Sequence, residues 1–136
     1  MTEQPIVLYV EDDTQSRKLM NMLLKGRMNL SHVTILEDSS DFVDKVNALD
    51  PKPNIIFLDI HVKPYDGFEM LEMLHKLEWA QDTPIVALTA SVMNEEVHKL
   101  RTVGFSGCLA KPIDLGTFPD TLDRILNGEI VWRILN

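Results

Sequence analysis

Short apolar runs alternate with amphipathic segments along most of the chain, and this alternation is the feature that most constrains the fold. The apolar runs show no polar alternation, which is typical of strands buried on both faces of a parallel sheet. They span residues 6–10, 33–36, 54–58, 84–88 and 107–110. Segments between and after them, such as 14–24 and 118–126, place apolar residues at helical spacing. This repeated strand–helix pattern predicts a single α/β domain whose parallel sheet is covered by helices on both faces.

The composition of the 136-residue chain agrees with one globular domain. Acidic residues outnumber basic ones by 21 to 13. This balance argues against nucleic acid or an anionic membrane as the partner, because both favour clustered Lys and Arg. No apolar run approaches the roughly 20 residues of a spanning helix, and the first residues lack the layout of a signal peptide. The lone Cys108 excludes an internal disulfide, so we expect a cytoplasmic protein.

Polar residues directly follow four of the five predicted strands. They are Glu11, Asp12 and Asp13 after the first strand, Asp59 after the third, Thr89 after the fourth and Lys111 after the fifth. Ligands of open α/β sheets bind beyond the carboxyl ends of the strands. We therefore expect these side chains to converge at one edge of the sheet, with Asp13 also serving as the N-cap of the first helix.

The residue types at this edge indicate phosphoryl chemistry. Carboxylates from two strands repel one another unless a cation neutralises them, and several hard oxygen ligands suit Mg²⁺. An aspartate beside Mg²⁺ can act as a nucleophile and form an aspartyl phosphate. Lys111 can neutralise charge on the phosphoryl oxygens, and Thr89 can donate its hydroxyl to one of them. The groups that phosphoryl capture requires are therefore present.

Four motifs resemble those of the response-regulator receiver domains of two-component signalling. They are Val-Glu-Asp-Asp at 10–13, Leu-Asp-Ile at 58–60 with Asp66-Gly67 after it, Leu-Thr-Ala at 88–90 and Ala-Lys-Pro at 110–112. The resemblance covers residues from about 6 to 127 and assigns residues 1–128 to the receiver domain. It implies a flavodoxin-like fold, in which a doubly wound five-stranded parallel sheet of order 2-1-3-4-5 is flanked by five helices.

The resemblance also implies a role for each residue of the site. Asp59 resembles the phosphoacceptor, Thr89 the conformational switch hydroxyl and Lys111 the family's invariant lysine. The metal ligands would be Glu11, Asp12, Asp59 and the backbone carbonyl of His61, with Mg²⁺ as the cofactor.

The implied function is that of a stand-alone phosphorelay response regulator. A sensor histidine kinase or a histidine phosphotransfer protein would donate a phosphoryl group to Asp59. The chain would catalyse its own phosphorylation and autodephosphorylation, without turnover of a separate substrate. It would then signal to a downstream protein through phosphorylation-dependent contact.

Some positions depart from the family pattern. Cys108 stands where the family usually has Tyr or Phe, and Lys63 precedes Pro64 where the proline is expected one residue earlier. His61 and Ser91 lie where the family tunes dephosphorylation. These departures leave open an alternative function as a scaffold or dimerisation module with weak or altered switching. A phosphohydrolase shares the same chemistry, but so short a chain has no sizeable insert for substrate specificity.

Residues 129–136 form an apolar C-terminal tail outside the strand–helix repeat. Two interpretations remain open for it. The tail folds back on its own domain, or it contacts a partner or a second copy of the chain in a homodimer.

Overall fold

The computed structural model describes residues 4–90 and 94–133. In these ranges, one sheet contains six strands in the order β2-β1-β3-β4-β5-β6, and all neighbouring strands are parallel. The strands are β1 (Val7–Val10), β2 (Val33–Leu36), β3 (Ile55–Asp59), β4 (Ile85–Thr89), β5 (Gly107–Ala110) and β6 (Val131–Arg133). The predicted order 2-1-3-4-5 is confirmed, and β6 is an additional strand that the sequence analysis did not predict.

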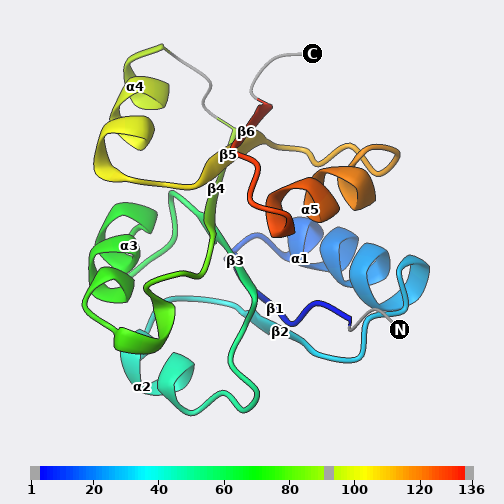
Figure 1. Cartoon of the computed structure of the whole chain (residues 1–136), viewed down its shortest axis with the longest axis horizontal. Coiled ribbons are helices and arrows are strands. Elements are labelled where there is room, and N and C mark those ends of the chain that lie inside the picture. The colour runs from blue at the N-terminus through cyan, green and yellow to red at the C-terminus, as the bar shows by residue number, and fades with distance from the viewer. Residues whose placement is uncertain (1–3, 91–93, 134–136) are drawn as a thin grey trace.

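Helices cover both faces of this sheet. The α-helices of the described ranges are α1 (Thr14–Asn21), α2 (Phe42–Asn47), α3 (Gly67–His75), α4 (Asn94–Val103) and α5 (Phe118–Leu126). A π-helical segment, η1 (Met22–Arg27), continues α1, and a 3₁₀ turn, η2 (Glu78–Ala80), follows α3. Figure 1 shows α1 and α5 on one face and α2, α3 and α4 on the other. The doubly wound α/β fold is thus confirmed.

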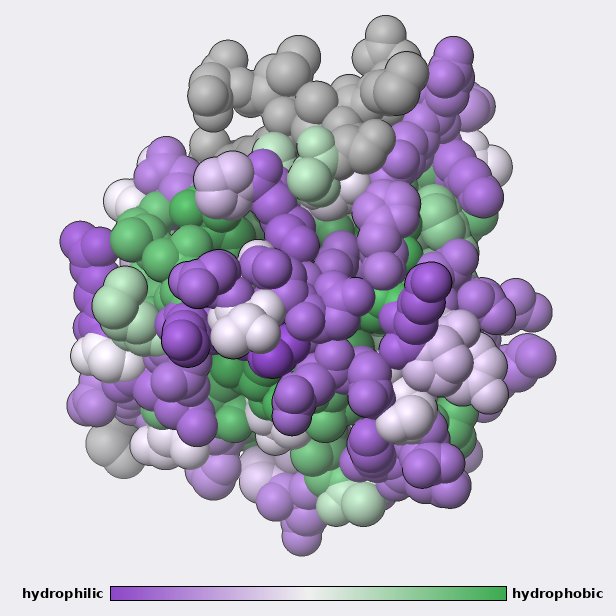
Figure 2. Space-filling model, turned by 180° about the vertical axis from the view of Figure 1, so that it is seen from behind, coloured by the Kyte–Doolittle hydropathy of each residue, from purple (hydrophilic) through white to green (hydrophobic). Residues whose placement is uncertain are grey.

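The core consists of two apolar layers, because successive residues of a strand point to opposite faces of the sheet. In β1, Leu8 and Val10 belong to the layer under α2, α3 and α4, whereas Val7 and Tyr9 belong to the layer under α1 and α5. Strands β1, β3 and β4 are buried along their whole length, which explains their unbroken apolar sequences. The face shown in Figure 2 is mainly hydrophilic, with hydrophobic residues in smaller separate areas.

Side-chain caps fix where two helices begin next to the carboxyl edge of the sheet. The Asp13 carboxylate accepts a hydrogen bond of 2.8 Å from the backbone N–H of Ser16, which confirms the predicted N-cap of α1. Asp66 and Glu69 form a reciprocal capping box at the start of α3. Both helices therefore start directly after the loops that carry the acidic residues. No helix of the described part of the chain is long and apolar enough to cross a membrane.

Strand β6 pairs with β5 because a glycine allows the two backbones to come close. Gly107 lies opposite Val131, and a Cβ atom on Gly107 would be only 2.5 Å from the carbonyl oxygen of Val131. Trp132 packs against the core, and the guanidinium of Arg101 lies 4.7 Å from the centre of its ring. This part of the C-terminal segment therefore lies along its own sheet. Residues 134–136 lie outside the described residues.

Candidate functional site

Three carboxylates meet at the carboxyl edge of the sheet. Strands β1 and β3 are neighbours with Val10 paired to Leu58, so the next residues along the chain, Glu11 and Asp59, lie side by side. One carboxylate oxygen from each of Glu11, Asp12 and Asp59 can be chosen so that all three lie within 4.8 Å of one another. Glu11 and Asp59 are buried and Asp12 is exposed. The structure therefore brings together the acidic residues that the sequence analysis selected.

Lys111 provides a positive charge within this acidic group. Its Nζ atom lies 2.8 Å from Oε1 of Glu11 and 3.5 Å from Oδ2 of Asp59. Burial acts to lower the pKa of the Lys111 ammonium, but the two carboxylates outweigh this effect and raise it. Lys111 is therefore held in its charged form, and it offsets part of the repulsion between the carboxylates.

Glu11 is a fully buried acid with donors on both carboxylate oxygens. The Tyr9 hydroxyl donates to Oε1 at 2.7 Å, and the backbone N–H of Asp13 donates to Oε2 at 3.2 Å. Burial raises the pKa of Glu11, while the hydrogen bonds from Lys111 and Tyr9 act in the opposite direction. The sequence analysis did not select Tyr9. The available signal was its position two residues before Glu11, because residues two apart in an extended chain point to the same side.

The backbone around Asp59 is packed closely against the start of α3. The Asp59 carboxylate accepts a hydrogen bond of 3.2 Å from the backbone N–H of His61. A Cβ atom on Gly67 would lie 2.7 Å from Cδ1 of Ile60 and 3.3 Å from the carbonyl oxygen of Asp59. The glycine of the Asp66-Gly67 motif is thus required for α3 to pack on the strand end that carries Asp59.

The loop between Asp59 and α3 is held by a buried serine of the loop between β2 and α2. The Ser39 hydroxyl donates to the carbonyl oxygen of Tyr65 and accepts from its backbone N–H, both at 2.7 Å. The Ser39 backbone N–H also donates to the carbonyl oxygen of Lys63 at 3.1 Å. This serine therefore fixes the segment in which the proline is shifted to Pro64. The sequence analysis missed it, because no local pattern marks this long-range contact.

Thr89 and His61 are both close to a residue of α4 that the sequence analysis did not select. The buried Thr89 hydroxyl donates to Oε1 of Glu96 at 3.0 Å. Nε2 of His61 lies 3.8 Å from the same oxygen, and the imidazole is largely exposed. Thr89 and His61 are thus linked to the first turn of α4 through Glu96. Ser91, to which the sequence analysis gave a tuning role, lies outside the described residues.

The donor set at this edge fits Mg²⁺. Magnesium binds hard oxygen ligands and retains waters in its shell, and the site offers carboxylates from Glu11, Asp12 and Asp59. The backbone carbonyl of His61 would complete the protein ligands that the resemblance implies. Asp12 is the exposed member of this set, so water can reach the carboxylates from its side.

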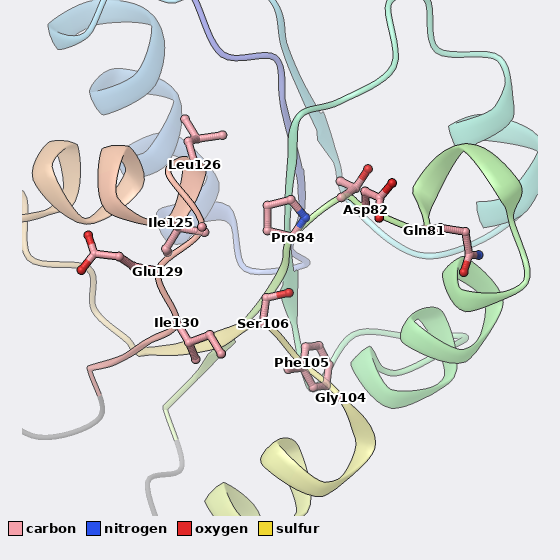
Figure 3. A pocket seen from close by; sticks show the side chains of 12 residues that line it. Gln81, Asp82, Pro84, Gly104, Phe105, Ser106, Ile125, Leu126, Glu129 and Ile130 are labelled. Atoms are coloured by element: carbon pink, nitrogen blue, oxygen red, sulfur yellow. The ribbon is translucent and has the colours of Figure 1, made fainter.

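Hollows in the surface lie at both edges of the sheet. A hollow of about 440 Å³ lies at the amino edge of the sheet, where Figure 3 shows Pro84 and Ser106 just before β4 and β5, and Ile130 after α5. A smaller hollow of about 240 Å³ lies beside Lys111, between α1 and the segment after β5. Because ligands of open α/β sheets bind beyond the carboxyl ends of the strands, the carboxylate edge is the candidate site.

With this fold and this edge established, the chain can be placed in a family. It belongs to the response regulator receiver domain family, which matches residues 7–123. The family resemblance seen in the sequence motifs is therefore confirmed, and the chain is a receiver domain related to those of histidine kinases in two-component systems.

Individual proteins extend this relationship. The chain is 32% identical over 123 residues to the signal transduction histidine-protein kinase BarA of Escherichia coli, and this match covers 90% of the chain but 13% of the kinase. The receiver domain of the sensor histidine kinase PA1611 of Pseudomonas aeruginosa has a TM-score of 0.80 at 21% identity, with coverage of 93% of this chain and 100% of that one. That crystal structure has a magnesium ion coordinated in its active site cleft. The chemotaxis response regulator CheY4 of Vibrio cholerae has a TM-score of 0.78 at 24% identity, with coverage of 90% and 99%.

Proposed function

We propose that this chain is a phosphorelay response regulator that accepts a phosphoryl group on Asp59 and signals by protein contact. The observation that carries the proposal is the position of Asp59 between Lys111 and the two acidic residues that follow β1. The Lys111 ammonium lies 3.5 Å from Oδ2 of Asp59, and Glu11 and Asp12 each have an oxygen within 4.8 Å of an Asp59 oxygen. A carboxylate in such surroundings can attack phosphorus, because the charge that develops on the phosphoryl oxygens is neutralised nearby.

The transfer step is an in-line displacement at phosphorus. A carboxylate oxygen of Asp59 forms a bond to phosphorus, and the bond from phosphorus to the imidazole nitrogen of the donor histidine breaks. The imidazole leaves with the electron pair and takes up a proton, and the product is an aspartyl phosphate. Lys111 stabilises the negative charge of the phosphoryl oxygens, and the Thr89 hydroxyl donates a hydrogen bond to one of them.

We assign the cofactor Mg²⁺ to the carboxylates of Glu11, Asp12 and Asp59 and to the backbone carbonyl of His61. When bound, this ion supplies charge neutralisation and orients the phosphoryl oxygens. The carboxylate ligands support the choice of Mg²⁺, and a magnesium ion is also the ion in the receiver domain of PA1611. Tyr9 and Lys111 fix the position of the buried Glu11 within this ligand set.

The partners follow from the chemistry of the transfer. The donor is a sensor histidine kinase or a histidine phosphotransfer protein in the cytoplasm, and the relationship to the receiver domain of a histidine kinase such as BarA supports this choice. The output is contact with a downstream protein. Hydrolysis of the aspartyl phosphate, catalysed at the same site, returns the chain to its starting state.

The proposal is tested by the mass of the intact protein after incubation with Mg²⁺ and acetyl phosphate. The parent chain should gain one phosphoryl group, and Asp59→Asn should gain none, because the amide nitrogen and oxygen are poor nucleophiles. A phosphorylated histidine donor should label the parent in the same way. Equal labelling of the parent and of Asp59→Asn with either donor would contradict the assignment.

A further inference from the structure

Glu96 connects the hydroxyl at the end of β4 to helix α4. Its carboxylate lies on the first described turn of α4, is 21% exposed, and accepts the hydrogen bond of 3.0 Å from the Thr89 hydroxyl. Thr89 itself is completely buried. This contact therefore joins a buried group of the candidate site to a helix that faces solvent on its other side.

The hydroxyl of a threonine has a single hydrogen to donate. It can be given to Oε1 of Glu96 or to an oxygen of a phosphoryl group on Asp59, but not to both at once. A phosphoryl group on Asp59 also adds negative charge at the edge where the Glu96 carboxylate lies, and like charges repel. The two acceptors thus compete for the same proton, and α4 is attached to one of them.

We propose that Glu96 is a positioning residue, which holds the Thr89 hydroxyl on α4 in the unphosphorylated protein and releases it when Asp59 is phosphorylated. This proposal rests on the proposed function, because it requires a phosphoryl group at Asp59. The release of Thr89 frees the first turn of α4, so the surface of α4 is the part of the molecule that reports phosphorylation to a partner.

The other groups near Glu96 interact with its carboxylate more weakly than the Thr89 hydroxyl does. Nε2 of His61 lies 3.8 Å from Oε1, which is longer than a hydrogen bond, and the imidazole is exposed. The Cys108 thiol is fully buried on β5, and its pKa is raised by burial and by the charge of Glu96. A protonated thiol is a weak donor. The short contact to Thr89 is thus the one whose loss changes the position of Glu96 most.

The test measures the affinity of the protein for beryllofluoride with Mg²⁺, since this ion mimics a phosphoryl group on a carboxylate. Glu96→Ala should bind beryllofluoride about three- to tenfold more tightly than the parent, because Glu96 then no longer competes with the phosphoryl mimic for the hydrogen of the Thr89 hydroxyl. The matched control is Glu95→Ala, which removes an exposed carboxylate from the same turn and should change the affinity by less than twofold. Glu96→Gln keeps an acceptor oxygen, so its affinity for beryllofluoride should lie between that of Glu96→Ala and that of the parent.

A double-mutant cycle with Thr89→Val distinguishes positioning from a simple charge effect. In the Thr89→Val background, Glu96→Ala should change the affinity by less than twofold. The same gain with and without the Thr89 hydroxyl would overturn the proposal, as would a Glu96→Ala affinity equal to that of the parent. Failure of the parent itself to bind beryllofluoride or to take label from acetyl phosphate would instead overturn the phosphoacceptor assignment, and this proposal with it.

Amide hydrogen exchange of residues 94–103 gives a second measurement. In the parent, beryllofluoride should speed exchange in the first turns of α4. In Glu96→Ala, exchange in these turns should already be fast, and beryllofluoride should add little. Exchange in α4 that is identical in Glu96→Ala and Glu95→Ala, and equally responsive to beryllofluoride, would contradict the proposed release.

Discussion

The ammonium group of Lys111 lies 2.8 Å from the fully buried carboxylate of Glu11. Through this contact the Lys111 side chain links the segment after β5 to the segment after β1, although β3 and β4 lie between these two strands in the sheet. It leaves the neighbouring Asp59 carboxylate within 3.5 Å of the same ammonium. Lys111 therefore stabilises the acidic group before any metal or phosphoryl group is bound.

Removal of this cation should destabilise the folded chain. Lys111→Met leaves the buried Glu11 carboxylate beside Asp59 without its partner, and we expect the free energy of unfolding to fall by about 3 kcal/mol. Urea unfolding at neutral pH measures this change. Glu11→Gln in the Lys111→Met background should recover most of the loss, and Lys18→Met on the exposed side of α1 serves as the control. A Lys111→Met protein as stable as the parent would show that the ion pair has no such role.

Mg²⁺ should raise the Tm of the parent, and this increase should depend on the Asp12 carboxylate as a ligand. Asp12 is the exposed carboxylate of the acidic group, so Asp12→Asn should leave stability without the ion nearly unchanged. The increase in Tm on addition of saturating Mg²⁺ should be largely lost in this variant, because binding to the folded state is the source of the increase. The control Asp13→Asn removes the adjacent charge but keeps the N-cap oxygen, and its response to Mg²⁺ should match the parent. Equal responses of Asp12→Asn and the parent would exclude Asp12 as a ligand.

Two glycine substitutions should have opposite effects on stability. In Gly67→Ala the new Cβ would lie 2.9 Å from Cα of Ile60, so the backbone next to Asp59 must shift. We expect a loss of about 1–3 kcal/mol and slower labelling by acetyl phosphate. In Gly26→Ala nothing lies within 4 Å of the new Cβ, and this helical site should gain about 0.5–1 kcal/mol. Chemical denaturation of both variants checks the prediction, which fails if Gly67→Ala is neutral.

Cys108 should be inert in the folded protein. Burial raises the pKa of its thiol to about 12, so at pH 8 only about one thiol in ten thousand is ionised, and the thiolate is the reactive form. Iodoacetamide at pH 8 should therefore leave the folded chain unmodified and alkylate it fully in urea, as intact mass will show. Rapid alkylation of the native protein would mean that the thiol is accessible and ionised.

The same shift in the pKa of Cys108 makes the free energy of unfolding depend on pH in the alkaline range. The unfolded thiol loses its proton near its ordinary pKa of 9.0, whereas the folded thiol keeps it until about pH 12. Between these values the folded state binds more protons, so the free energy of unfolding should fall as the pH rises above 9. The stability that the protonated Cys108 thiol contributes is fully present below pH 9 and is lost as the pH rises toward 12. The slope between pH 9 and 11 should be smaller in Cys108→Ala than in the parent, and equal slopes would contradict the assigned shift.

Strand β6 should detach when Gly107 is replaced. The Cβ of Gly107→Ala would lie 2.5 Å from the carbonyl oxygen of Val131, a backbone atom that cannot move without breaking the pairing. Trp132 should then become more exposed, and its fluorescence should shift to longer wavelength. A Trp79→Phe background leaves Trp132 as the single tryptophan. An unchanged spectrum in Gly107→Ala would show that β6 tolerates the side chain.

The main features of the fold and of the site could be predicted from sequence because they depend on local pattern. The apolar runs of β1, β3 and β4 are continuous since these strands are buried on both faces, and Asp59, Thr89 and Lys111 lie at their expected strand ends. Parallel strands place their carboxyl ends at the same edge. The alternation was therefore enough to predict that the acidic residues and the lysine meet at one edge, whereas the strand order came from the resemblance to receiver domains.

The missed features depend on contacts between distant segments. Strand β6 has three residues, too few for a periodic pattern, and it forms because Gly107 allows close approach of its backbone. Glu96 and its neighbour Glu95 suit the first turn of any helix electrostatically, so the contact of Glu96 with Thr89 was not evident in the sequence. Ser39 acts on the loop after Asp59 only through the tertiary structure. Such contacts require the folded arrangement to be known.

The most direct test of the central claim is to find the residue that carries the phosphoryl group. After labelling with acetyl phosphate and Mg²⁺, reduction with borohydride converts an aspartyl phosphate to homoserine, and tandem mass spectrometry locates this residue in the digested chain. The account predicts homoserine at position 59 in the parent and at no position in Asp59→Asn. Homoserine at Asp12 or elsewhere, with position 59 unchanged, would contradict the assignment of Asp59 as the phosphoacceptor.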